Sequence, residues 1–239
     1  MSANTTHTLD PAIAVGRERA PMLRRLAAAC GALFPLAIII GDDNINGAGE
    51  APTIDAPIAE VNDYLASAAG ASADGSYWIG RGIGVLGFVA LLVFTVYVAR
   101  TIRDREGSGG LLSGFALGGG LVAVVLGLLA AIAQFAAVAR AGEGIDPEVA
   151  RALLDVSTIA FVGTWLPLAV LIGSVAVAGI RFGILSRWTA IAGGIVTVAL
   201  LAGLAALPAD GAYMAMVLSW LWFIAASVVL VRRGGDDHA

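Results

Sequence analysis

Residues 111–139 read LLSGFALGGGLVAVVLGLLAAIAQFAAVA and contain no charged side chain. An α-helix rises about 1.5 Å per residue, so about 20 apolar residues are enough to cross the roughly 30 Å hydrocarbon core of a bilayer. This stretch is therefore long enough to cross a membrane as a single helix.

Five other stretches of the chain have the same character. Only 13% of the 239 residues are charged and 59% are hydrophobic, whereas a soluble domain carries about 25% charged residues. We predict an all-α membrane protein, a six-transmembrane-helix bundle that fills residues 22–233 and leaves tails at 1–21, expected to be disordered, and 234–239. Besides Leu111–Ala139, the predicted spans are Leu26–Gly41, Ile79–Ala99, Leu153–Ile180, Trp188–Leu207 and Tyr213–Val231.

The arginines gather on alternate connections between these spans. All 14 basic residues are arginine, which is typical of a GC-rich bacterial genome. If both termini lie inside, 11 arginines lie in the cytoplasm, and only Arg81, Arg140 and Arg151 lie outside. This split follows the positive-inside rule. We therefore expect a bacterial cytoplasmic membrane protein with both termini inside. The inner arginines lie at the span ends, which also suits anionic lipid headgroups.

The predicted outer segment 42–76 has seven acidic residues and no basic one. Pro57 suits a first helical turn and Gly70 a helix end. Between them we expect a short amphipathic helix that lies on the outer membrane surface or caps the bundle. Its apolar residues recur at helical spacing, beginning just before the proline: Ile54, Ile58, Val61 and Leu65.

A second helix start lies before the fourth span. Asp146 as N-cap with Pro147 at the first helical position predicts a helix from there. We expect it to run without a break to Ile180 and to kink near Gly163–Pro167, because proline removes a backbone donor and clashes with the preceding turn.

Small residues spaced by four occur on several spans, and such spacing lets helices approach closely in lipid. We expect these faces to pack within the bundle. A homodimer or another membrane partner at the Gly110/Gly114/Gly118 face is the alternative. Trp220 and Trp222 lie near the middle of the last span. Either one of them lines a cavity or they fill gaps left by the glycine-rich helices, and we favour the second. The small-residue positions are Gly110, Gly114 and Gly118, Gly80 and Gly84, and Ala190 and Gly194.

The sequence lacks the residues that several kinds of catalytic and metal-binding chemistry require. The only histidines, His7 and His238, lie in the tails, and the single cysteine, Cys30, excludes an intramolecular disulfide. There is no nucleophile motif, phosphate loop or CxxC, and no carboxylate lies near the middle of a predicted span. Coupled transporters usually keep an ionisable group there. We expect no enzyme activity, no cofactor and no metal.

A candidate polar site remains at the predicted outer face, formed by Arg81, Asp155, Thr158 and Trp165. An arginine this close to hydrocarbon is expected to find a partner. Asp155 is one possibility, but it lies about 10 Å farther from the inner span ends than Arg81 does, at about 1.5 Å per residue. Arg151, four residues before Asp155 on one helix, is the easier partner for that carboxylate.

The segment Asp42-x-Asn44-x-Asn46-Gly47 matches the first half of a calcium loop, in which alternate oxygen ligands precede a glycine. The twelfth position should be a glutamate and is Thr53. An acidic turn after the first span is the alternative, and we favour it.

The segments Gly75-Ser-Tyr-Trp-Ile-Gly-Arg81-Gly-Ile-Gly and Phe182-Gly-Ile-Leu-Ser-Arg187, within this architecture, resemble a bacterial integral membrane family, domain-of-unknown-function family 4386. Ser186 stands where that family would have a proline. The resemblance covers roughly 22–233. It implies the six-span fold and no site, since the family has no established chemistry.

Two functions fit the sequence. The first is a non-enzymatic accessory or partner-binding protein whose bundle and acidic outer loop hold a partner or organise lipid. The second is a small permease or channel-like transporter for a neutral or lipophilic solute, with a cavity near Arg81, Thr158 and Trp165. We favour the first, because the spans are poor in polar side chains.

Overall fold

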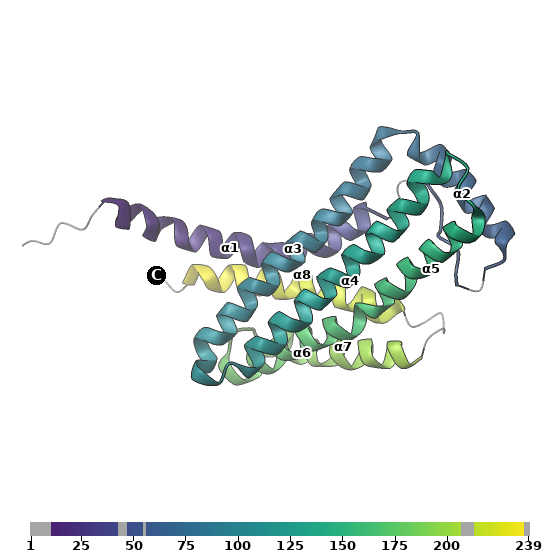
Figure 1. Ribbon diagram of the computed structural model, residues 1–239. Helices are drawn as coiled ribbons and strands as arrows, with labels where there is room; N and C mark the ends of the chain where they lie inside the picture. Colours follow the sequence, from purple (N-terminus) through teal and green to yellow (C-terminus); the bar gives the residue numbers. More distant parts are fainter. Residues whose placement is uncertain (1–10, 43–46, 55, 207–212, 237–239) are drawn as a thin grey trace, which may run out of the picture.

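The computed structural model describes residues 11–42, 47–54, 56–206 and 213–236 (Figure 1). All regular elements in these ranges are helices, in agreement with the predicted all-α class. They are α1 (Pro11–Ile40), α2 (Ile58–Ser72), α3 (Gly75–Glu106), the 3-10 turn η1 (Gly107–Gly109), α4 (Leu111–Ala141), α5 (Pro147–Gly163), α6 (Trp165–Phe182), α7 (Arg187–Ala205) and α8 (Tyr213–Asp236).

Six helical segments in the described ranges are long and apolar enough to cross a membrane, so the chain has the features of a multi-pass membrane protein. Large apolar side chains stand on their outer surfaces, for example Ile79 with 68% and Trp188 with 80% of its surface exposed. Such exposure suits helices surrounded by lipid. The segments are Met22–Ile40, Gly75–Gly109, Leu111–Ala141, Pro147–Phe182, Arg187–Ala205 and Tyr213–Arg233.

The boundaries differ from the predicted ones at the chain ends. Helix α1 begins at Pro11, within the segment expected to be a disordered tail, and α8 continues to Asp236. The stretch 11–21 contains three alanines, two arginines and one glutamate, which are good helix formers.

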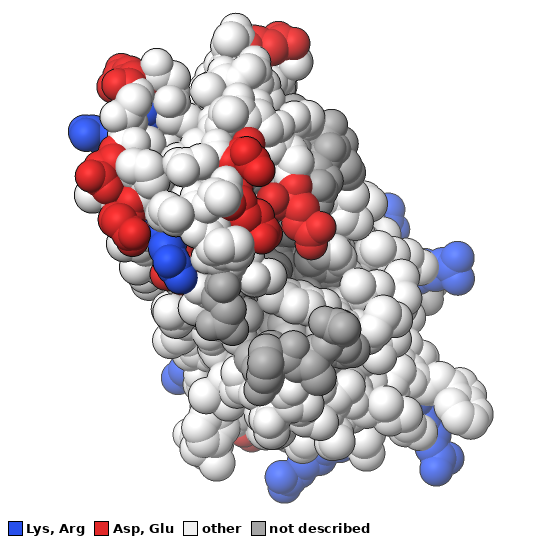
Figure 2. Space-filling view, turned by 90° about the vertical axis from the view of Figure 1, so that its right-hand side faces the viewer, with Lys and Arg blue, Asp and Glu red and all other residues white. Residues whose placement is uncertain are grey.

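The molecule has two distinct ends (Figure 1). At one end α3, α6 and α8 finish and α4 and α7 begin. It carries Arg100, Arg181, Arg187 and Arg233, and we call it the basic end. At the other, α2 lies across the ends of α4 and α5, and we call it the α2 end. Acidic side chains gather on part of the molecular surface seen from that side (Figure 2).

Helix α4 packs against α3 and α6 through glycines, but not those predicted. A side-chain carbon added at Gly119 would lie 2.7 Å from the carbonyl oxygen of Pro167, and one at Gly120 would lie 2.2 Å from the Thr95 side chain. At Gly114 and Gly118 nothing lies within 4 Å. The prediction that these two glycines pack within the bundle is therefore wrong. A helix turns about 100° per residue, so the packed face begins one residue farther along.

The other small-residue faces fit the prediction in part. Gly84 of α3 meets Gly41 just after α1, with their backbones in contact, and Ala190 of α7 is buried. On α7, however, Gly193 rather than Gly194 faces a neighbour: the Trp222 indole occupies the space beside it. Trp222 thus fills a gap left by a glycine, as expected.

The fourth span starts where predicted and then breaks. The Asp146 carboxylate accepts the backbone N–H groups of Glu148 (2.8 Å) and Val149 (3.4 Å), and Pro147 follows it. The expectation of an unbroken helix is wrong. Helix α5 ends at Gly163, α6 begins at Trp165, and a turn at Thr164 separates them. Pro167 supplies no backbone N–H to the carbonyl four residues earlier, at Gly163, so the helix is interrupted there.

Helix α2 confirms the predicted short amphipathic helix, with Pro57 as its N-cap. It ends at Ser72 rather than Gly70, and Ile54 lies before it, half-exposed. The helix packs against α4 and α5 over a second apolar core, separate from that of the main bundle. We call it the α2-end core: Ala48, Val61, Tyr64, Leu65, Ala68, Tyr77, Ala137, Val138, Ala150 and Leu154.

Helix α3 has its own N-cap at this end. The Asp74 carboxylate accepts the backbone N–H of Ser76 at 3.0 Å. This hydrogen bond lowers the pKa of Asp74 from its ordinary value, since it stabilises the ionised carboxylate.

Candidate functional site

Arg81 connects the first turns of α3 to two other helices. Its guanidinium donates to the carbonyl of Gly41 at 3.1 Å and to Oε1 of Gln134 at 2.9 Å. Gly41 directly follows α1, where the last carbonyls of a helix lack intrahelical partners and carry partial negative charge. Arg81 therefore caps α1 and links α3 to α4.

Gln134 extends this contact to α2. Its amide nitrogen donates to the hydroxyl of Tyr64 at 3.5 Å, a long hydrogen bond. Sequence reasoning missed Gln134, although a signal was present: it is the only glutamine of the chain, and it stands inside the uncharged stretch 111–139. An amide buried in a helix of this kind usually bonds to a neighbouring helix. Arg81, Gln134, Gly41 and Tyr64 form what we call the Arg81 network.

Asp155 does not belong to the Arg81 network. Within the described ranges no ion pair joins it to Arg81, which agrees with the difference in depth between the two positions. The easier pair, Arg151 with Asp155, does not form either. Instead, the Arg151 guanidinium donates to the carbonyl of Ile54 at 3.4 Å. Asp155 and Thr158 are both partly buried on α5.

Trp165 is completely buried at the start of α6. Its ring lies edge-on to Tyr213 of α8, with 5.7 Å between ring centroids. Among the described residues its indole N–H has no hydrogen-bond partner. No hydrogen bond or ion pair in the same ranges joins Trp165 or Thr158 to Arg81. The four predicted residues are therefore not held together as one bonded polar site.

The middle of the bundle is filled by aromatic and aliphatic side chains. The ring of Phe223 on α8 packs against Phe34 of α1 at 5.4 Å and against Phe94 of α3 at 5.7 Å. Phe88 packs against Phe34 at 5.9 Å, and its ring also occupies the space beside Gly127. These rings meet at tilted or edge-on angles, the arrangement that aromatic pairs prefer.

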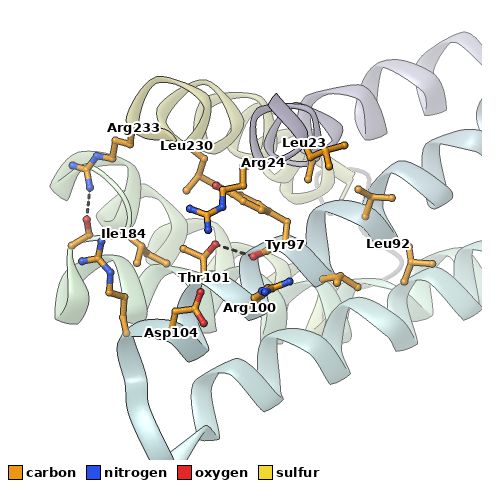
Figure 3. Close-up of a pocket in the computed structure, with 15 residues that line it drawn as sticks. Leu23, Arg24, Leu92, Tyr97, Arg100, Thr101, Asp104, Ile184, Leu230 and Arg233 are labelled. Atoms are coloured by element: carbon orange, nitrogen blue, oxygen red, sulfur yellow. Dashed lines mark hydrogen bonds between the residues drawn. The ribbon is translucent and has the colours of Figure 1, made fainter. Parts of the chain in front are cut away.

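A groove of about 890 Å³ opens at the basic end (Figure 3). It is bounded by α1, α3, α8 and the turn between α6 and α7, and we call it the basic groove. Figure 3 shows side chains from α1 and α3 projecting into the same space. Its charged lining residues are Arg24, Arg100, Asp104, Arg105 and Arg233.

The turn on one side of the basic groove has a fixed geometry. Gly183 ends α6 with φ of 68°, the left-handed conformation that glycine adopts without a steric penalty. Arg233 of α8 donates to the Gly183 carbonyl. No local sequence pattern places Arg24, Arg100 and Arg233 together, because they come from helices far apart in the chain.

The half calcium loop is only partly described. Residues 43–46, which include Asn44 and Asn46, lie outside the described ranges. Among the described residues no group of three or more histidine, cysteine or acidic side chains could hold a metal ion. The calcium loop and the acidic turn therefore both stay predictions.

Comparison of the chain with protein-family models, with curated proteins and with solved structures gave no match, so the resemblance to family 4386 stays a prediction.

Proposed function

We propose that the protein is a non-enzymatic accessory protein of a bacterial cytoplasmic membrane, with both termini inside, that binds a membrane partner. The observation that carries this proposal is the filled interior of the bundle. Phe94, Phe223, Leu91 and Trp222 are at most 3% exposed and occupy the space between α1, α3, α7 and α8. A permease would need a path for its solute through this region.

The buried polar groups near these side chains are isolated hydroxyls. Thr95 and Ser227 are buried, and among the described residues their oxygens have no hydrogen-bond partner. Each is in close contact with a glycine of a neighbouring helix: Thr95 with Gly120, and Ser227 with Gly31. Both hydroxyls therefore lie at helix–helix contacts, which supports a packing role for them.

Uptake into proteoliposomes tests this proposal against the permease. We expect small neutral solutes such as glycerol and urea to enter vesicles that hold the protein no faster than vesicles without it. The opposite result would be entry several times faster than into empty vesicles, and loss of that entry in Phe223→Trp, a variant that overfills the interior. This result would refute the accessory function and support the permease.

The partner surface that we propose is the Gly110/Gly114/Gly118 face of α4. Gly114 and Gly118 are exposed with open space beside them, and Leu111 and Phe115 nearby are 65% and 52% exposed. Small residues beside large ones allow close helix contact in lipid. The occupant is a second copy of this chain or another membrane protein.

Photo-crosslinking in the membrane tests this surface. A crosslinking amino acid at Phe115 should give a discrete product, whereas one at Ile195 of α7, 63% exposed, should give only lipid adducts. A product mass of twice the chain identifies a homodimer. Equal crosslinking at both positions would refute a partner at the α4 face.

A further inference from the structure

The basic groove carries an excess of positive charge and is open at the surface of the molecule. Four arginines and one aspartate line it. Arg24 comes from α1, Arg100, Asp104 and Arg105 come from the end of α3, and Arg233 comes from α8. A surplus of positive charge in one groove favours an anionic ligand.

Three of these arginines make no polar contact with the part of the chain that the structure describes. Among the described residues, Arg24, Arg100 and Arg105 make no hydrogen bond and no ion pair with a carboxylate. A guanidinium presents five donors in a planar fork, which matches two oxygens of a phosphate group. Figure 3 shows Arg24 and Arg100 extending from facing helices into the groove. Their donors are therefore available to a phosphate between α1 and α3.

One part of the groove lining is apolar and runs along α3 away from the arginines. On α3 this apolar part consists of Leu92, Val93 and Val96, and Val93 and Val96 are 40% and 49% exposed. Leu92 lies eight residues before Arg100, which is about 12 Å along a helix. The groove thus has one charged part, at the end of α3, and one apolar part about 12 Å long.

We propose that the basic groove binds one anionic phospholipid, of the phosphatidylglycerol class. The headgroup phosphate bonds to Arg24 and Arg100, and one acyl chain lies along Leu92, Val93 and Val96. A soluble phosphate ester would leave this apolar wall uncovered, whereas a lipid covers both parts of the groove. Basic pockets between membrane helices are known to take such headgroups, and a volume of about 890 Å³ lies within the usual range of ligand sites. The proposal holds whether or not the protein transports a solute.

Native mass spectrometry of the full chain in detergent tests the site directly. Phosphatidylglycerol is titrated against phosphatidylcholine with the same acyl chains. The site variant is Arg24→Gln with Arg100→Gln. The control variant is Arg25→Gln with Arg103→Gln, two exposed arginines that do not line the groove. Both variants lose the same charge, so general attraction to anionic lipid falls equally.

We expect phosphatidylglycerol to bind wild type more tightly than phosphatidylcholine does. At about fivefold per arginine contact, the site variant should lose roughly 25-fold in affinity for the first phosphatidylglycerol molecule. The control variant should lose less than about fivefold. Thermal unfolding without added lipid should be the same in all three proteins, because all four arginines are exposed. If the double variants do not fold, Arg24→Gln and Arg25→Gln alone give the same comparison.

Three outcomes would overturn the proposal. Equal losses in the two variants would show general surface charge rather than a site. Equal affinity for the two lipids would show that the headgroup charge is not recognised. Displacement of the lipid by an equal concentration of glycerol phosphate would assign the groove to a soluble phosphate ester. None of these outcomes depends on the uptake or crosslinking results.

Discussion

Replacing Gly119 with alanine perturbs the contact between α4 and α6 at a single point. The added carbon would lie 2.7 Å from the carbonyl oxygen of Pro167 and 3.0 Å from the amide nitrogen of Leu171. Both atoms belong to the backbone of α6, so they cannot rotate away as a side chain could. Only a shift of one helix relative to the other relieves the overlap.

The size of the effect follows from this shift. Ordinary contact begins at 3.4 Å, so the helices must separate by about 0.7 Å, and a gap of that size loses a quarter to a half of the dispersion energy of the neighbouring contacts. Overpacking of this kind costs about 1–3 kcal/mol. Alanine is also favoured over glycine by about 1 kcal/mol in helix propensity. A control variant with the same gain is therefore needed.

Gly118→Ala is the matched control, because Gly118 is the preceding residue of the same helix and a side-chain carbon added there would meet no other helix within 4 Å. We expect Gly119→Ala to be about 1–3 kcal/mol less stable than Gly118→Ala. The measurement is reversible unfolding in mixed micelles with increasing dodecyl sulfate, followed by tryptophan fluorescence, at a concentration where both variants are monomeric. A difference below about 0.5 kcal/mol, the usual effect of a surface substitution, would refute the assignment of α4 faces.

Three further predictions use the same unfolding assay. Gln134→Leu should cost about 1.5–3 kcal/mol, because it removes a hydrogen bond to the charged Arg81; Gln134→Glu should keep most of the stability, and equal losses in both would refute the contact. Trp222→Phe loses the indole N–H donated to a backbone carbonyl at 3.0 Å and should be destabilised by about 0.5–1.5 kcal/mol more than Trp220→Phe, whose indole N–H has no partner in the described ranges; the reverse order would contradict this. Asp74→Ala should lower Tm at pH 7, and because the folded-state pKa of Asp74 is lowered, the difference from wild type should shrink as pH falls below about 4; a difference unchanged at pH 2 would exclude the cap.

The number and positions of the spans could be predicted because both depend on local properties. Uninterrupted apolar length identifies a membrane helix, and Asp146 with Pro147 marks a helix start, whatever the rest of the chain does. The predicted kink near Gly163–Pro167 has the right position for the same reason, although the predicted unbroken helix is wrong. The change is larger than a kink: a turn at Thr164 separates α5 from α6.

Contacts between helices could not be predicted from the sequence. They depend on how each helix is rotated about its own axis and on its position along the bundle relative to its neighbours. Residues 111–120 of α4 carry glycines at several angles around the helix, and spacing alone does not show which of them meets α6. Arg81 and Gln134 are 53 residues apart, so their contact depends on where α3 and α4 stand relative to each other. The basic groove combines residues from three helices and from the turn at Gly183 and Ile184. No local sequence pattern predicts it.

The α2-end core has a consequence for how the chain is made. Helix α2 is synthesised before all the helices that cover it: Tyr77 follows it in α3, Ala137 and Val138 in α4, and Leu154 in α5. Leu154 is translated 82 residues after Ser72, which takes about 4–16 s at about 5–20 residues per second. During that time the α2-end core is incomplete, because Ala150 and Leu154 of α5 are still missing from it. The charged and exposed Glu60 and Asp63 favour a position of α2 in water rather than in the lipid core over this interval, because burying a carboxylate in hydrocarbon is costly.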